Sequence, residues 1–87
     1  MKSIEKYNLA IEDGDLLKAA KIAAEIASRK ASRWNRTCWL RDSQECLEKA
    51  GVLTPDLEKT LRRADVTGNF ETLLSLLDSL AGEDGGQ

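Results

Sequence analysis

The chain has 87 residues, of which 41% are hydrophobic and 32% are charged, and its formal net charge is −2. A chain of this length has room for one domain with a modest core, because it buries only about 60–65% of its unfolded surface. The composition excludes a wholly disordered chain. The short apolar runs exclude a membrane span, which needs about 20 consecutive apolar residues.

The beginning of the chain and its cysteines both predict a cytoplasmic protein. Residues 1–5 carry charge but no apolar stretch follows them, so we expect no signal peptide. Cys38 and Cys46 are eight residues apart in helical sequence, which separates them by about 12 Å along a helix axis. That distance is too long for a disulfide unless the chain bends, so we expect two free, buried thiols.

The first two predicted helices are separated by Gly14. Residues 3–13 form the first, with apolar residues at helical spacing. The second is predicted over residues 16–41, about 39 Å long, because small and apolar residues repeat every three or four positions. This stripe consists of Leu16, Ala20, Ala23, Ala27, Ala31, Trp34 and Cys38.

The end of this long helix has two interpretations. Its next stripe positions would be Asp42 and Glu45, which are unsuited to a core, and the segment 42–45 matches a capping box. We therefore expect a short third helix that begins there and ends at Gly51. The alternative is one helix that continues to Ala50. Both interpretations place Trp34 in the core.

Two further helices are predicted in the second half of the chain. Thr54-Pro55-Asp56 is a typical helix start, with a cap, a proline in the first turn and an acid beside it. That helix ends near Gly68, and residues 70–81 form the last helix. We expect a single domain over residues 1–82 and a disordered acidic, glycine-rich tail over residues 83–87.

The predicted fold is all-α, a compact bundle of four to five helices. A weak internal repeat supports antiparallel helical hairpins. Residues 14–27 and residues 68–81 each begin with a glycine and a polar residue, and a predicted helix comes next. We expect such hairpins to pack around the long alanine-rich helix.

No pattern in the sequence supports catalysis. The chain has no histidine, the commonest general base and a frequent metal ligand. The spacing of Cys38 and Cys46 is not that of a zinc site, and neither a nucleophile motif nor a phosphate loop is present. We therefore expect no catalytic residues, no metal and no cofactor, and a function in binding another macromolecule.

Charge is distributed unevenly along the chain. Residues 15–41 carry a net charge of +5, and residues 42–87 carry a net charge of −6. At about 100° per residue, four cationic side chains would form one line on the long helix, opposite the apolar stripe. This predicted basic ridge consists of Lys18, Arg29, Arg33 and Arg36.

From this ridge we expect a non-catalytic protein–protein interaction module, such as a small adaptor, inhibitor or regulatory subunit. Its partner would be a protein with an acidic surface, since arginine binds carboxylates in a bidentate manner. Trp39 lies off the apolar stripe and either packs on the next helix or stands at the interface. The candidate partner-binding residues are Lys18, Arg29, Arg33, Arg36, Trp39 and Arg41.

Two alternatives use the same features. A nucleic-acid-binding regulator would use the same basic helix, although the sequence pI of about 5.1 is low for such a protein. A structural homo-oligomer would pair the basic and acidic halves of two copies. A homodimer could also form through the last helix, whose leucines cover more than one face.

Overall fold

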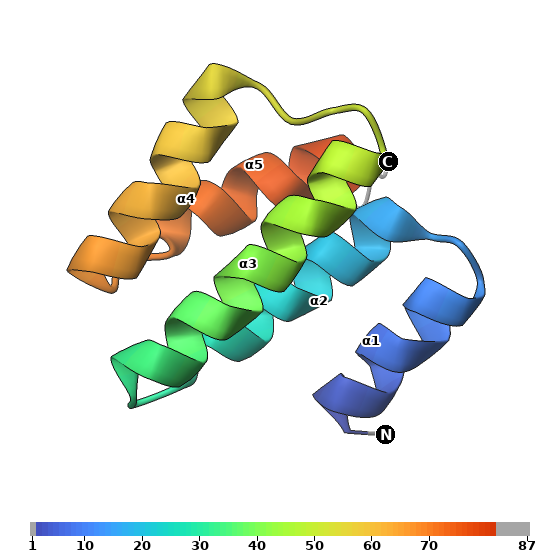
Figure 1. The fold of residues 1–87 in the computed structure, drawn as a ribbon, viewed down its shortest axis with the longest axis horizontal. Coiled ribbons are helices and arrows are strands. Elements are labelled where there is room, and N and C mark those ends of the chain that lie inside the picture. The colour runs from blue at the N-terminus through green and yellow to red at the C-terminus, as the bar shows by residue number, and fades with distance from the viewer. Residues whose placement is uncertain (1, 82–87) are drawn as a thin grey trace.

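The computed structural model of the protein describes residues 2–81, and within them it contains five α-helices and no strand (Figure 1). The predicted all-α class is confirmed. The predicted tail, residues 83–87, and the predicted domain end at residue 82 lie outside this range. The helices are α1 (Ser3–Glu12), α2 (Leu16–Ser28), α3 (Arg33–Lys49), α4 (Pro55–Thr67) and α5 (Glu71–Ala81).

Capping residues explain where α2 and α4 begin and where α4 ends. Asp15 accepts a hydrogen bond from the backbone N–H of Lys18 over 3.3 Å, and Thr54 accepts one from the N–H of Leu57 over 3.1 Å. Each bond satisfies a backbone donor that has no partner within the first turn of its helix. Gly68 ends α4 with φ +79°, a left-handed conformation that glycine adopts without strain.

The predicted single helix over residues 16–41 is wrong. α2 ends at Ser28, residues 29–32 form a connection, and α3 continues without a break through Asp42 to Lys49. A straight helix over residues 16–41 would be about 39 Å long, whereas the longest dimension of the molecule is 29 Å. By reversing direction, the chain lays α3 along α2 (Figure 1).

α2 is the central helix, because it contacts α1, α3 and α5. Where it meets α3, the hydroxyl of Ser43 donates a hydrogen bond to the backbone carbonyl of Ala20 over 2.8 Å, and Ser43 is fully buried. A side chain this short reaches the backbone of the next helix only because α2 presents small residues there. These fully buried residues are Ala19, Ala20, Ala23, Ala24 and Ala27.

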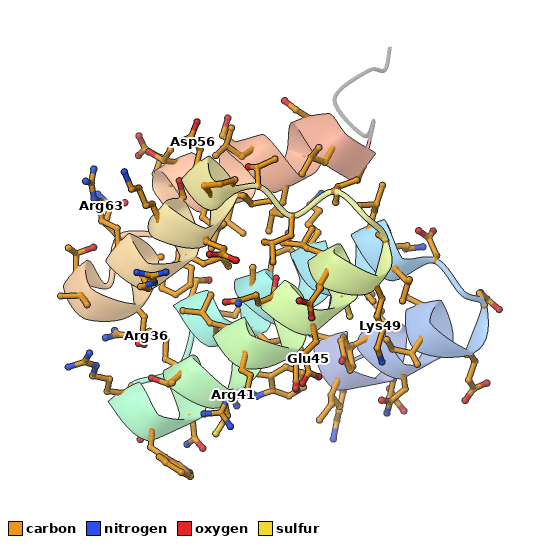
Figure 2. All side chains as sticks on the ribbon, turned by 45° about the horizontal axis from the view of Figure 1, so that its top comes forward. Arg36, Arg41, Glu45, Lys49, Asp56 and Arg63 are labelled. Atoms are coloured by element: carbon orange, nitrogen blue, oxygen red, sulfur yellow. The ribbon has the colours of Figure 1, made fainter. Side chains whose placement is uncertain are left out.

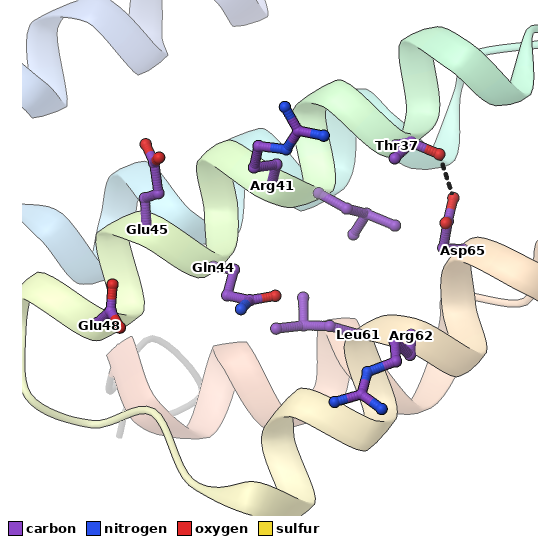
Figure 3. Close-up of a pocket in the computed structure, with 9 residues that line it drawn as sticks. Thr37, Arg41, Gln44, Glu45, Glu48, Leu61, Arg62 and Asp65 are labelled. Carbon is purple, nitrogen blue, oxygen red and sulfur yellow. Dashed lines mark hydrogen bonds between the residues drawn. The ribbon is translucent and has the colours of Figure 1, made fainter.

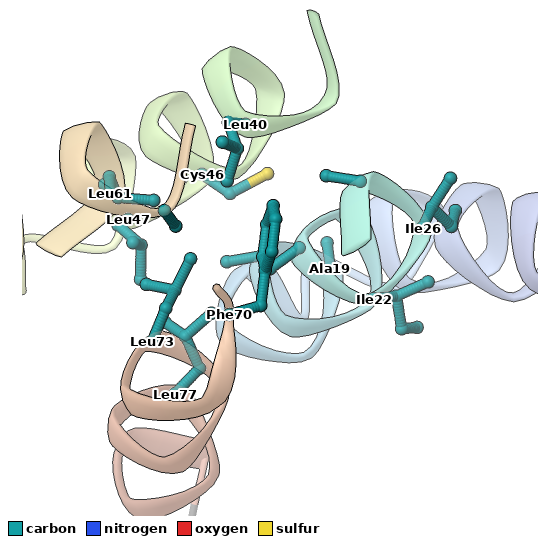
Figure 4. Close-up of a cluster of buried hydrophobic side chains, with 14 of the residues drawn as sticks. Ala19, Ile22, Ile26, Leu40, Cys46, Leu47, Leu61, Phe70, Leu73 and Leu77 are labelled. Atoms are coloured by element: carbon teal, nitrogen blue, oxygen red, sulfur yellow. The ribbon is translucent and has the colours of Figure 1, made fainter. Parts of the chain in front are cut away.

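Leucine and phenylalanine side chains fill the space between α2, α3, α4 and α5. The side chains of Leu73 and Leu77 on α5 point into this cluster, and an ion pair of 2.7 Å between Lys21 and Asp78 joins α2 to α5. Cys46 is buried in this cluster, and Cys38 is half-buried; both thiols are free. Large members of the core include Leu40, Leu47, Leu61, Phe70, Leu73 and Leu77 (Figure 4).

α5 buries only part of its apolar surface. Leu73 and Leu77 are fully buried, whereas Leu76 and Leu80 remain partly exposed. The leucine-rich face predicted from the sequence is therefore not wholly absorbed by the core. None of the helices within residues 2–81 is long and apolar enough to cross a membrane.

Trp34, which the apolar stripe placed in the core, is 73% exposed in the first turn of α3. The predicted apolar stripe assumed one continuous helix, but the chain turns at residues 29–32. The stripe residues of α3 therefore do not continue the buried face of α2. The core therefore depends on Leu47 in α3, which is fully buried, and receives nothing from Trp34.

Replacing these two side chains tests this assignment of the core. Leu47→Ala leaves a cavity among packed side chains, and we expect it to lower the free energy of unfolding by about 2–5 kcal/mol. Trp34→Ala removes a larger side chain from an exposed position and should change that free energy by less than about 0.5 kcal/mol. Urea unfolding of both variants measures the difference. Comparable losses would contradict the structure.

Candidate functional site

The predicted basic ridge does not form a single line. Its members would need to share one helix, but the chain reverses between them. Lys18 lies in the first turn of α2, about 16 Å along the helix from Arg29, which follows the end of α2. Arg33 and Arg36 belong to α3. Arg29 also donates a hydrogen bond to the hydroxyl of Ser3 over 2.9 Å, which directs it toward α1.

Arg36 joins α3 to the end of α4. Its guanidinium donates a hydrogen bond to the backbone carbonyl of Asp65 over 2.5 Å, and its Nε lies 3.8 Å from the carboxylate of the same residue. Only 18% of the Arg36 side chain is exposed. A Cβ at Gly68 would lie 3.2 Å from this guanidinium, so the turn after α4 fits closely around it. Arg36 therefore has a structural role within the fold.

Asp65 connects the same two helices through α3 side chains on either side of Arg36. Its Oδ1 accepts a hydrogen bond from the hydroxyl of Thr37 over 2.7 Å, and its Oδ2 lies 3.9 Å from the guanidinium of Arg33. Arg33 remains 64% exposed, so this long contact leaves most of its surface to solvent. The start of α3 and the end of α4 are thereby held together.

This connection gathers cationic side chains from two distant parts of the sequence. Residues 29–36 and 62–68 together contain six lysines and arginines and one carboxylate, a net charge of +5, which leaves −7 for the rest of the chain. Arg36 and Arg63 lie at the same end of the molecule in Figure 2, whereas Lys49 lies far along α3. We call this region the basic end; its cations are Arg29, Lys30, Arg33, Arg36, Arg62 and Arg63.

Two large apolar side chains are exposed at the basic end. Trp34 follows Arg33 in the first turn of α3 and is 73% exposed, and Val66 follows Asp65 in α4 and is 66% exposed. Arg33 lies 3.9 Å from Asp65, so each exposed apolar residue follows one member of this ion pair in the sequence. An exposed tryptophan among arginines has the composition of an interaction hot spot.

Trp39 has a different environment from the one an interface would require. It is half-buried, and its ring meets that of Tyr7 edge-to-face, with the centroids 5.4 Å apart and the planes at 87°. Trp39 therefore packs α3 against α1. The two predicted alternatives were packing on the following helix and exposure at a partner interface. Arg41 is exposed further along α3 and lines a cleft outside the basic end.

That cleft, of about 390 Å³, lies between α3 and α4 (Figure 3). Leu40 and Leu61 form its floor, and Gln44 points toward Leu61. Its rim carries both charges, with arginines on each helix and glutamates toward the end of α3. The mixed charge gives the cleft no clear preference for an anion or a cation. The charged rim residues are Arg41, Glu45, Glu48 and Arg62.

The sequence interpretation missed Arg62 and Arg63. It counted them with the acidic second half of the chain, because their neighbours in sequence are mainly acidic. Only the contact between Asp65 and the start of α3 brings them to the basic end. No local signal in the sequence indicates this contact. Within residues 2–81, no group of three potential metal ligands comes together.

Comparison with known proteins gives no assignment for this surface. No protein-family model, curated protein or solved structure matches the chain.

The contact between Trp39 and Tyr7 has a measurable consequence at high pH. Burial of the phenol, with a smaller contribution from Cys46, raises the pKa of Tyr7 to about 12. Since the unfolded pKa is near 10, the folded protein retains a proton that the unfolded chain loses, and stability falls as pH rises from 10 to 12.

Tyr7 is the only tyrosine in the chain, so the absorbance of tyrosinate reports on it alone. We expect a midpoint near pH 12 in the wild type. Trp39→Ala should move the midpoint toward 10, because water then reaches the phenol. A wild-type midpoint near 10, measured while circular dichroism shows that the helices are intact, would contradict the packing of α1 on α3.

Proposed function

We propose that the protein is a non-catalytic interaction module, such as an adaptor, inhibitor or regulatory subunit, that binds an acidic surface of another protein through its basic end. The observation that supports this proposal most strongly is the exposure of Trp34 beside Arg33. Tryptophan and arginine are the residues most enriched at the energetic centres of protein interfaces.

Covering Trp34 would contribute substantially to binding. A buried tryptophan removes about 150–250 Å² from water, and 73% of Trp34 is available for covering. At about 25 cal/mol per Å² this corresponds to roughly 3–5 kcal/mol before the costs of association. The surrounding cations would add specificity and faster encounter with an acidic partner.

The charge distribution favours a protein partner over a nucleic acid. The basic end carries +5, but the rest of the chain carries −7 and the sequence pI is about 5.1. A duplex extends beyond the basic end and would meet the acidic remainder, which repels phosphates. A folded partner with one acidic patch contacts the basic end alone.

Only some of the predicted site residues belong to the contact surface under this proposal. Arg29 and Arg33 belong to the contact surface, together with Lys30, Arg62 and Arg63. Arg36 is mostly buried and holds α3 and α4 together by donating a hydrogen bond to the carbonyl of Asp65. Lys18, Trp39 and Arg41 lie outside it. Lys18 is at the other end of α2, Trp39 packs on Tyr7, and Arg41 is about 8 Å further along α3 than Arg36.

Photo-crosslinking from position 34 tests the proposal. The chain is expressed in its source cell with Trp34→p-benzoylphenylalanine, and the matched control is Glu45→p-benzoylphenylalanine, an exposed position on α3 outside the basic end. We expect a protease-sensitive adduct from position 34 only. Adding Arg29→Glu/Arg33→Glu should reduce its yield at least about tenfold, the effect of 1.4 kcal/mol on an affinity.

The nature of the adduct decides between the alternatives. A nuclease-sensitive adduct would replace the proposal by nucleic-acid binding, and an adduct of twice the chain mass would replace it by self-association. Equal adducts from both positions, or none from position 34, would contradict a function of the basic end.

A further inference from the structure

A second cleft, of about 420 Å³, lies between α4 and α5 and is distinct from the mixed-charge cleft. Ala64 and Leu73, both buried, form its floor. Lys59 and Arg63 line it from α4, four residues apart and therefore on one face of the helix. Thr67, the last residue of α4, lines the cleft beside Arg63, and two uncharged polar side chains line it where the chain enters α5: Asn69 and Thr72.

The two cations of this cleft have no anionic partner in the part of the chain that the structure describes. No carboxylate there lies within 4.0 Å of Lys59 or Arg63, whereas the neighbouring Arg62 lies 3.7 Å from Glu58. Like charges four residues apart on a helix repel each other. Asp56 also lines the cleft, three residues before Lys59 and about 10 Å along the helix from Arg63, so the negative charge lies at the Lys59 end and not at the Arg63 end.

The hydrogen-bonding groups at the Arg63 end of the cleft are mainly donors. Asn69 uses its side-chain oxygen to accept from the N–H of Glu71 over 3.1 Å, which leaves the N–H₂ of its amide as the remaining group. The hydroxyl of Thr67 is occupied, since it donates to the carbonyl of Arg63 and accepts from the N–H of Asn69. The hydroxyl of Thr72 has no partner among the described residues.

We propose that this cleft binds a phosphate monoester, with the phosphate between Arg63, Lys59 and the side chains of Asn69 and Thr72. A dianionic phosphate balances the two cations, and a guanidinium binds phosphate in a bidentate manner. The volume of about 420 Å³ exceeds what a phosphate needs and leaves space for the esterified group. Arg63 also belongs to the basic end, but the proposed phosphate site stands whether or not the basic end binds a protein.

Nuclear magnetic resonance titration of the ¹⁵N-labelled protein tests the site at constant ionic strength. The probes are inorganic phosphate, O-phosphoserine and a glycine-flanked phosphoserine peptide, with serine and chloride as blanks. We expect saturable shifts at the backbone amides of residues 69–72 and at the side-chain Nε of Arg63. Lys59→Gln/Arg63→Gln should weaken binding at least about tenfold, because charge-assisted hydrogen bonds are lost.

The matched control is Arg41→Gln, which removes an exposed arginine that lines the other cleft and lies outside the basic end. It should leave the affinity unchanged within about twofold. Tighter binding of the peptide than of O-phosphoserine would identify a phosphorylated protein as the source of the ester, and equal binding would identify a small phosphorylated molecule. Absence of saturable shifts up to about 10 mM phosphate, or equal weakening by both variants, would overturn the proposal.

Discussion

The close contact between α2 and α3 positions every other part of the fold. The alanine face of α2 lets α3 approach until the hydroxyl of Ser43 bonds to the carbonyl of Ala20. That approach requires the chain to reverse between the two helices, in residues 29–32. The reversal places Arg33 and Trp34 at one end of the molecule, where α4 joins them through Asp65. The basic end is thus a consequence of how tightly two helices pack.

Local signals were sufficient to predict much of this structure. The cap at Asp15, the start of α4 at Thr54 and the glycine that ends α4 each follow from the chemistry of one or two residues. The reversal in residues 29–32 carries no such signal, because helical periodicity continues across it through Ala31 and into α3. The chain has to turn because the molecule measures only 29 Å along its longest axis. The predicted helix, about 39 Å long, would not fit within it.

The candidate site was predictable only where it lies on contiguous sequence. Arg29 and Arg33 were identified because they are close in the chain and cationic. Arg63 lies at the same end only because Arg36 contacts Asp65, two residues after Arg63, and no sequence pattern indicates that contact. Neither tryptophan lies where it was predicted, since Trp34 is exposed and Trp39 packs on Tyr7 of α1. The reversal explains the positions of both tryptophans, because it changes the direction in which each face of α3 points.

A distance across the reversal tests this account most directly. Spin labels are attached through Lys18→Cys and Arg41→Cys, after Cys38→Ser and Cys46→Ser remove the native thiols, and their separation is measured by double electron–electron resonance. A continuous helix would separate these positions by about 35 Å. Since α3 lies back along α2 at a spacing of about 8–10 Å, the account predicts a single population below about 20 Å. A population near 35 Å would show that the chain does not reverse, and the basic end would then not exist.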